Sequence, residues 1–303
     1  MIVVGVDGSM TARAAVDWAA ADAFRAHLPL RIVHAVDRSP YQVDRFGGSG
    51  GGIRAGSGDG FGAGSGGGSG GGDTLVREGQ RVLREAVALA RERQPSVEVA
   101  TRDIEGSPVA VLREQAERAD EIVLGSRGLG GFAGTLLGSV SAQVAGQASC
   151  PVVVVRGERR PRQGRIVAGV DDSPTSEPAL AYAFQQADLR GSALQVVHAF
   201  APEIARDLDE VCAGRHRVVQ KRLSAFRDRY PHLEVEEIVR FAHPVDALTA
   251  ASAEADLVVV GSHGRGPFGA AVLGSVSRGV LHHARCTVAV VRAPRADVPA
   301  QRT

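Results

Sequence analysis

Cysteine is scarce in this sequence of 303 residues, which contains only Cys150, Cys212 and Cys286. Their spacing fits neither a metal site nor a disulfide framework, because both need more cysteines or histidines at short, regular intervals. Few cysteines without a pairing pattern are typical of a reducing compartment. We therefore expect all three to be small, buried side chains.

The chain also lacks an excess of charge and a long hydrophobic run. Lysine and arginine number 35 against 34 acidic residues, so no global field attracts nucleic acid or a membrane surface. No stretch approaches the roughly 18 apolar residues of a membrane span, and the first residues lack the pattern of a secretory signal. We expect a cytoplasmic protein with no membrane span and no nucleic-acid partner, in which any anion site is local.

Lysine is nearly absent, and this excludes the usual phosphate loop. The single lysine, Lys221, follows Gln220 rather than the glycine that a Walker loop requires. Residues 264–269 match the letters of the dinucleotide fingerprint, yet they follow the fourth predicted strand of their copy, and no acidic residue stands about 20 positions further on. Neither P-loop hydrolysis nor NAD binding is encoded in the usual form.

What the sequence does contain is an internal repeat. Residues 2–9 return as residues 166–173, and residues 33–35 return as residues 197–199, both displaced by 164 positions. Later anchors are displaced by 136 positions: Pro95, Pro108, Asp120, Gly125 and Cys150 match Pro231, Pro244, Asp256, Gly261 and Cys286. The first copy therefore carries a net 28 extra residues, and the chain consists of two copies of one unit.

The extra residues lie in a segment of the first copy, at about residues 47–72, that is mostly glycine and serine. Such a composition cannot bury enough apolar surface to offset the entropy lost on ordering, so we expect a disordered loop. A phosphate cradle is the alternative, but such cradles are short and open a helix directly. The predicted domains are residues 1–156, which include this insert, and residues 165–293, joined by a charged linker.

Each copy alternates strand and helix signals, which predicts an α/β fold with parallel strands covered by helices. Strands are expected near residues 2–6, 30–36, 97–104, 121–125 and 152–156, and near residues 166–170, 193–199, 234–240, 257–261 and 287–292. Helices are expected after Ser9 and from Ser173-Pro174, near residues 75–93 and 211–229, near residues 108–118 and 244–254, and from Gly138-Ser139 and Gly274-Ser275.

The last strand of each copy, Val152 to Val155 and Val288 to Val291, is entirely apolar or nearly so. An apolar strand at an open sheet edge favours aggregation unless it is paired. We expect the two copies to pair through these strands as a pseudo-dimer within the chain, and further association of two chains stays open.

A glycine motif follows the fourth strand of each copy. Residues 125–128 read Gly-Ser-Arg-Gly and, after nine residues, residues 138–141 read Gly-Ser-Val-Ser. The second copy repeats this as Gly-Ser-His-Gly at residues 261–264 and Gly-Ser-Val-Ser at residues 274–277. Glycines would let backbone N–H groups approach an anion, and a helix that begins at Gly138-Ser139 would direct its free N–H groups toward phosphate. Two turns that only reverse the chain are the alternative.

Charge around the motif supports the cradle. No carboxylate occurs between Glu121 and Glu158, or between Asp256 and Asp297. Arg127, Arg265, Arg278 and Arg285 lie inside these two windows. The sequence therefore predicts a local positive field where phosphates would bind.

This glycine motif, present in both copies and accompanied by an aspartate after the first strand, resembles that of the universal stress protein family in its tandem form. The resemblance covers residues 2–156 and 165–292. It implies two Rossmann-like domains of the adenine nucleotide alpha hydrolase-like type, each an open five-stranded parallel sheet with flanking helices. The ATP-binding branch of the family carries this motif.

The resemblance also implies roles for individual residues. Asp7 with Ala35, and Asp171 with Ala199, would contact adenine, while Leu124-Gly125 and Val260-Gly261 would lie against the ribose. The phosphates would be held by Gly128, Gly138, Ser139 and Val140 in one copy and by Gly264, Gly274, Ser275 and Val276 in the other. Arg127 and His263 differ between the copies, so the two sites need not bind equally. Asp7 and Asp171 have an alternative role as turn residues at the entry to a helix.

The function implied is that of an ATP-binding regulator of stress response or growth, not an enzyme. A slow ATPase or another nucleotide-processing enzyme is the alternative, and a scaffold that has lost its ligand is a third. His34 and His198 recur beside the site, but no nucleophile accompanies them, so we expect buried, hydrogen-bonded histidines. No metal is expected apart from Mg²⁺ carried by the nucleotide.

Overall fold

The computed structural model describes residues 1–37, 70–129, 137–157, 160–173, 176–200, 208–263 and 273–293. The first half of the chain contains β1 (Ile2–Val6), α1 (Met10–Ala26), β2 (Leu30–Val36), α2 (Gly70–Arg93), β3 (Val99–Glu105), α3 (Pro108–Ala116), β4 (Glu121–Gly125), α4 (Ser139–Gln147) and β5 (Val152–Val155). Each strand except β5 is followed by a helix, as the predicted alternation requires.

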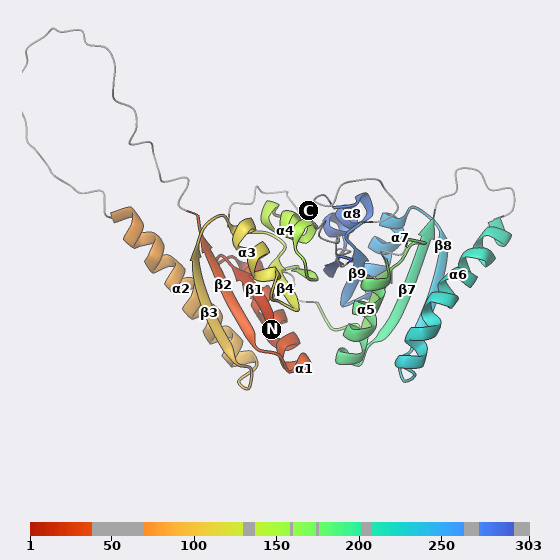
Figure 1. Ribbon diagram of the computed structural model, residues 1–303, viewed down its shortest axis with the longest axis horizontal. Helices are drawn as coiled ribbons and strands as arrows, with labels where there is room; N and C mark the ends of the chain where they lie inside the picture. Colours follow the sequence, from red (N-terminus) through yellow and green to blue (C-terminus); the bar gives the residue numbers. More distant parts are fainter. Residues whose placement is uncertain are drawn as a thin grey trace, which may run out of the picture.

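The second half repeats this order. It contains β6 (Arg165–Gly169), α5 (Glu177–Arg190), β7 (Ala193–Phe200), α6 (Leu208–Arg229), β8 (Val235–Phe241), α7 (Pro244–Ala251), a 3₁₀ turn (Ser252–Glu254), β9 (Leu257–Gly261), α8 (Ser275–His283) and β10 (Thr287–Val291). The two halves lie side by side with their outer strands β3 and β8 at opposite ends (Figure 1).

The ten strands form one sheet in the order β3-β2-β1-β4-β5-β10-β9-β6-β7-β8. Every pairing within a half is parallel, and the junction between β5 and β10 is antiparallel, with Val153 opposite Ala289. The predicted pairing of the two apolar edge strands is therefore confirmed. It converts two exposed edges into the centre of a continuous sheet.

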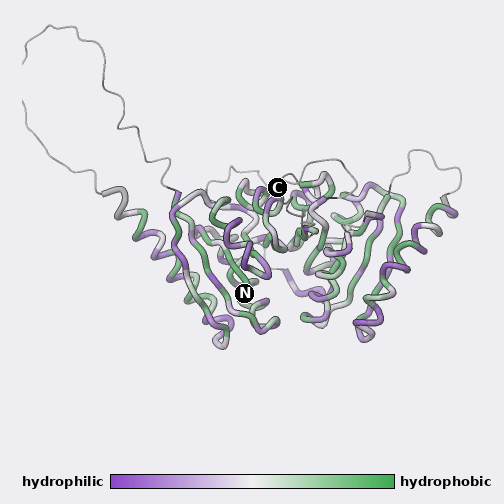
Figure 2. Tube along the Cα trace, in the orientation of Figure 1, coloured by the Kyte–Doolittle hydropathy of each residue, from purple (hydrophilic) through white to green (hydrophobic). Residues whose placement is uncertain are grey.

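Alternate residues of each strand point to opposite faces of the sheet, and helices cover both faces. Val4 packs with α1 and α2, while Val3 packs with α3 and α4. Apolar segments consequently run along the strands of the sheet interior (Figure 2). The outermost strand β3 carries exposed polar residues such as Arg102 and Asp103, which protects the remaining edge from pairing.

Two predicted boundaries need correction. Helix α5 begins at Glu177 with Ser176 as its N-cap residue, and not at Ser173-Pro174. The Ser173 N–H and hydroxyl both donate to the carboxylate of Asp171, so this serine closes a turn before the helix instead of capping it. Helix α2 begins at Gly70, so the last three residues of the predicted disordered insert are helical. The rest of that insert lies outside the described residues.

Two of the three cysteines are buried, as predicted, but Cys212 is only partly buried. Cys150 and Cys286 occupy matching positions before β5 and β10 in the same apolar layer. Burial raises the pKa of each of these two thiols to about 12, so they act as small apolar side chains. Cys212 lies on helix α6, where the repeat provides no matching cysteine to predict its environment.

Candidate functional site

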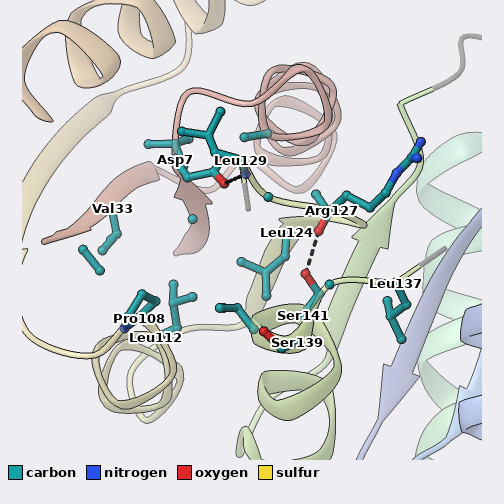
Figure 3. A pocket seen from close by; sticks show the side chains of 18 residues that line it. Asp7, Val33, Pro108, Leu112, Leu124, Arg127, Leu129, Leu137, Ser139 and Ser141 are labelled. Carbon is teal, nitrogen blue, oxygen red and sulfur yellow. Dashed lines mark hydrogen bonds between the residues drawn. The ribbon is translucent and has the colours of Figure 1, made fainter. Parts of the chain in front are cut away.

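A cavity of about 580 Å³ lies beyond the carboxyl ends of β1 and β4 (Figure 3). This is the edge of an open α/β sheet at which ligands bind, because loops from neighbouring strands separate there. The structure brings together all nine residues predicted for the first copy, which line this cavity: Asp7, Ala35, Leu124, Gly125, Arg127, Gly128, Gly138, Ser139 and Val140.

The first turn of α4 forms one wall of the cavity. Gly138 is the N-cap residue in an extended conformation, and its N–H donates to the carbonyl of Ser126 at 2.7 Å. The hydroxyl of Ser141 donates to the carbonyl of Gly125 at 2.6 Å, which fixes the helix start against the end of β4. The N–H groups of Ser139 and Val140 have no intrahelical acceptor, and the helix dipole places positive potential there.

The loop after β4 is tied to the loop after β1. The carbonyl of Arg127 accepts from the Thr11 hydroxyl, and the N–H of Leu129 donates to Oδ2 of Asp7 at 3.1 Å. The other carboxylate oxygen of Asp7 accepts from the N–H of Ser9 at 3.0 Å. Asp7 therefore has the turn role at the helix entry that the sequence left open, and it also lines the cavity.

Gly125, the last residue of β4, and Gly128, in the loop after it, allow close packing within the protein. A Cβ on Gly125 would lie within 2.6–2.8 Å of Thr11 and of the backbone N of Ala12. A Cβ on Gly128 would lie 2.7 Å from Oδ2 of Asp7. Their missing side chains thus allow α1 and Asp7 to pack against this loop, and close approach of a ligand is not needed to explain them.

The opposite wall is apolar and was not predicted. Pro108 and Leu112 of α3, together with Val33 of β2, complete the cavity (Figure 3). The repeat of Pro108 as Pro244 marked the start of a helix in each copy. It gave no information on which helical face points toward the glycine motif, because that depends on how the helix packs on the sheet.

A smaller cavity of about 250 Å³ occupies the matching place in the second half. The residues predicted for this copy that line it are Asp171, Ala199, Val260, Gly261, His263, Gly274, Ser275 and Val276. Gly264 lies outside the described residues. Two hydrogen bonds at the start of α4 in the first copy recur at the start of α8. The Ser277 hydroxyl donates to Gly261 O at 2.6 Å, and Gly274 N–H donates to Ser262 O at 2.9 Å.

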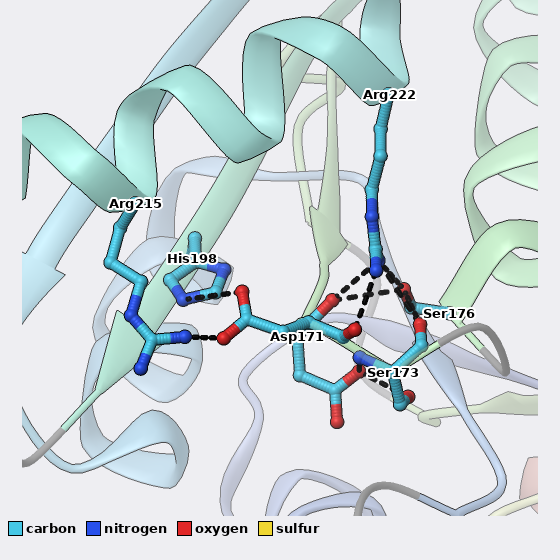
Figure 4. Close-up of polar contacts among 7 residues, drawn as sticks. Asp171, Ser173, Ser176, His198, Arg215 and Arg222 are labelled. Carbon is cyan, nitrogen blue, oxygen red and sulfur yellow. Dashed lines mark hydrogen bonds and ion pairs between the residues drawn. The ribbon is translucent and has the colours of Figure 1, made fainter.

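The second cavity differs in how its strand-to-helix turn is held (Figure 4). The guanidinium of Arg222 donates to the carbonyls of Asp171 at 2.7 Å and Asp172 at 2.6 Å, and to the hydroxyl of Ser176 at 2.8 Å. In the first copy the position of Arg222 is occupied by the buried Ala86, so no such clamp exists there. Alignment of the two copies shows that arginine replaces alanine at this position. It does not indicate that the Arg222 side chain reaches the turn before α5.

A second ion cluster lies next to this turn. Asp172 pairs with Arg215 and lies 3.7 Å from Nε2 of His198. Burial lowers the pKa of His198, although the negative charge of Asp171 opposes the effect. His198 is buried as predicted, whereas His34 is only partly buried and its Nδ1 lies 3.0 Å from Oδ1 of Asp103. Neither histidine is among the described residues that line the cavities.

The predicted positive field is weaker than the sequence suggested. Arg127 lines the first cavity, but its guanidinium extends away from the other labelled side chains (Figure 3). Arg278 and Arg285 do not line the second cavity, and Arg285 lies at the opposite end of the sheet, before β10. Arg265 is outside the described residues. The prediction for Arg285 relied on its closeness to the glycine motif in sequence. It is wrong because α8 runs from the cavity to the opposite end of the sheet before the chain reaches Arg285.

The described part of the chain contains no candidate metal site and no candidate membrane span. There, no group of three or more histidine, cysteine or acidic side chains is arranged to hold a metal ion. The helices in the same ranges lack the combination of length and apolar character that crossing a membrane requires.

The fold and the two cavities define a tandem α/β protein with one pocket at the carboxyl edge of each half-sheet. Residues 1–52, 63–156 and 163–292 match the family model of the universal stress protein family. Universal stress protein Rv2005c of Mycobacterium tuberculosis is 35% identical, over 96% of both chains, and Rv1996 of the same organism is 34% identical, over 97% of this chain and 95% of its own. The chain belongs to the universal stress protein family.

A solved structure supports the fold. The crystal structure of a universal stress protein from Archaeoglobus fulgidus has a TM-score of 0.68 and covers 97% of both chains at 19% identity. Similarity at this level of identity concerns the fold. The arrangement of two halves along the whole chain is therefore shared with a protein of very different sequence.

Proposed function

We propose that the chain binds ATP in both cavities and acts as a nucleotide-dependent regulator of stress response or growth. Asp7 and Ala35 would contact adenine, Leu124 and Gly125 the ribose, and Gly128 with residues 138–140 the phosphates. In the second half, Asp171, Ala199, residues 260–261 and residues 274–276 would do the same, with Gly264 at the position of Gly128. Mg²⁺ would arrive with the nucleotide.

One observation carries the proposal: in both halves a helix begins at the cavity wall, and its first N–H groups lack intrahelical acceptors. Such a helix start favours phosphate through hydrogen bonds and through the dipole. Val33, Leu112 and Leu124 provide an apolar surface in the same cavity, which suits a flat base. A phosphate on one side and a base on the other is the chemistry of a nucleotide.

The two sites should differ in affinity. Ligand cavities commonly enclose about 300–1,000 Å³, and the first cavity falls within this range while the second, at about 250 Å³, is smaller. The Arg222 clamp holds the turn at Asp171 and Ser176, so the second cavity would have to widen elsewhere to admit ATP. We expect the first cavity to bind ATP more tightly.

A binding role fits the described lining better than an enzymatic one. Both carboxylate oxygens of Asp7 already accept hydrogen bonds from backbone N–H groups, so this side chain is engaged in holding the loops together. A slow ATPase is the second candidate function, favoured by the cradle itself, since positioning of phosphate is most of what phosphoryl transfer needs.

The test uses protein freed of ligand by denaturation and refolding. Calorimetric titration with ATP should show binding in the wild type and at least about tenfold weaker binding in Gly128→Ala, because the new Cβ would push Asp7 away from the loop. Gly214→Ala is the matched control, since its Cβ would have nothing within 4 Å. Absence of ATP binding by the wild type would contradict the proposal, as would equal binding by the Gly128 variant.

Two further measurements separate the alternatives. Mass spectrometry of the native protein should detect co-purified adenine nucleotide, which a scaffold without a ligand would lack. Single-turnover hydrolysis of bound ATP should be negligible in the wild type. Hydrolysis that Gly128→Ala abolishes would favour the ATPase instead of the regulator.

A further inference from the structure

A third cavity, of about 600 Å³, lies at the junction of the two halves. Its lining comes from α1, the end of α2, the end of β5, the linker between the halves, Arg190 at the end of α5 and the start of β10. It shares no residue with either proposed nucleotide cavity. It therefore needs an explanation of its own.

The lining of this junction cavity is strongly basic. It includes eight arginines but only two acidic residues, Asp17 and Asp256. The whole chain has a formal net charge of +1. Eight of the 35 basic residues of the chain thus line one cavity, where they outnumber the acidic residues four to one.

The linker arginines are held by neutral groups. Arg160 donates to the carbonyls of Ser252 at 3.3 Å and Arg285 at 3.1 Å, and Arg162 donates to the carbonyl of Arg190. Arg156 donates to the carbonyl of Leu281 at 2.8 Å, near the end of α8. Carbonyl groups orient these guanidinium groups without removing their charge, so the site is rigid and remains positive.

The acidic residues of the lining compensate little of this charge. Asp256 accepts hydrogen bonds from the backbone N–H groups of Gln163 at 2.7 Å and Gly164 at 2.8 Å. Asp17 pairs with Arg93 at 3.1 Å. Asp22, which does not line the cavity, accepts hydrogen bonds from Arg25 at 2.8 Å and from Arg190 at 2.6 Å, so one carboxylate is shared by two guanidinium groups. Burial and the neighbouring charge of Arg190 lower the pKa of Arg25, although Asp22 acts in the opposite direction.

Two exposed arginines of the lining, called the rim arginines below, make few contacts within the protein. The guanidinium of Arg285 has no hydrogen bond or ion pair within the described ranges, and its residue is exposed. Arg13 is also exposed, and its nearest carboxylate oxygen, on Glu85, is 3.8 Å away. Joining the two halves would require neither of them. Both are available to a ligand.

We propose that the junction cavity binds a small organic or inorganic anion with two or more phosphate groups. Guanidinium groups bind phosphate oxygens in pairs, and several around one cavity favour a multiply charged ligand over a single phosphate. Trp18, Leu89 and Val155 add apolar surface that an organic ligand could cover. Because Arg160 and Arg162 belong to the linker, occupancy would stabilise the contact between the halves.

Inorganic triphosphate is the probe, titrated into the full-length chain by calorimetry at low ionic strength. Wild type should bind it, and Arg13→Glu with Arg285→Glu should weaken binding about tenfold or more, because two cations at the rim become anions. Arg118→Glu, a charge reversal at an exposed residue that does not line the junction cavity, is the control and should bind as the wild type does. Circular dichroism checks that all variants are folded, and Arg285→Gln alone gives a milder change if the double variant is not.

The outcomes are distinct. A binding constant that falls steeply with salt, together with loss in the rim variants only, supports the proposal. Equal binding by the wild type and the rim variants would place triphosphate elsewhere and overturn it, as would absence of binding. Citrate in a parallel titration separates the ligand classes: binding as tight as that of triphosphate would contradict the preference for phosphate.

Discussion

At the scale of the residue, Glu121 has an unusual environment for a carboxyl group. It is 4% exposed at the start of β4, and its Oε2 accepts a hydrogen bond from the hydroxyl of Tyr182 in the other half. The pKa of Glu121 is raised to about 8, mainly by burial and also by the charge of nearby Asp22, while Tyr182 and Arg190 act in the opposite direction. The group is therefore largely protonated at neutral pH.

This pKa predicts a pH dependence of stability. The pKa of Glu121 is higher in the folded chain than the ordinary value of 4.5, so the folded state binds more protons between the two values. The contribution of Glu121 to the free energy of unfolding should thus be largest below about pH 4.5. It should fall as the pH rises toward 8, by at most about 1.4 kcal/mol per pH unit. Burial raises the pKa of Asp22 too, with the same sign.

Glu121→Gln tests this prediction, because glutamine keeps the shape and cannot ionise. Urea unfolding between about pH 5 and pH 8 should show a smaller loss of stability with rising pH than in the wild type. Glu98→Gln, at an exposed position, should leave the wild-type pH dependence unchanged. Identical pH profiles for the wild type and Glu121→Gln would contradict the assignment.

At the scale of the element, helices α1 and α5 meet across the two halves through an ion pair. Both carboxylate oxygens of Asp22 accept from Arg190, at 2.6 Å and 2.7 Å, and the two side chains are 4% and 7% exposed. The guanidinium of Arg190 also lies 4.4 Å from the ring centre of Trp18. Such a pair is sensitive to the loss of either partner.

Asp22→Asn should destabilise the protein by about 3 kcal/mol or more, because the Arg190 charge would stay buried without a counter-ion. Asp17→Asn is a matched control on the same helix. Its partner Arg93 is 38% exposed, so the cost should stay below about 1 kcal/mol. Chemical denaturation of both variants at neutral pH measures the difference. Similar losses for the two would show that burial of Asp22 does not matter.

The elements themselves could largely be predicted from the sequence, because the repeat gives each strand and helix two independent signals. The contacts between α1 and α5 could not. Asp22 corresponds to Gln186 in the second copy and Arg190 corresponds to Ala26, so the pair does not follow the repeat. Sequence comparison of the copies shows where they differ, but it does not show that two such differences meet in space.

The candidate site, too, could be predicted from the sequence only in part. The family resemblance, carried by the glycine motif and the Asp after the first strand, predicted seventeen of the cavity-lining residues, nine in one cavity and eight in the other. The apolar wall from Pro108 and Leu112, and the Arg222 clamp, depend on the packing of helices far along the chain. The wrong prediction for Arg285 also comes from helix packing, since one short helix can span the full depth of a sheet.

At the scale of the whole molecule, the two halves share one interior. The sheet continues through the pairing of β5 with β10, and the apolar layer on each face includes residues of both halves. The buried pair of Asp22 with Arg190 and the bond from Tyr182 to Glu121 join them on one side. Separation of the halves would expose all of these groups, so we expect a single cooperative unit.

Leu223→Ala tests this cooperativity. Leu223 on α6 is fully buried in the second half, and its truncation should cost about 2–5 kcal/mol. Hydrogen exchange measured by mass spectrometry should then be faster in the β2 peptide of the first half as well, because exchange there requires opening of the shared sheet. Val218→Ala on the same helix, where the side chain is 41% exposed, should leave β2 unchanged. Faster exchange confined to α6 and its neighbours in the second half would mean that the halves open independently, despite their continuous sheet.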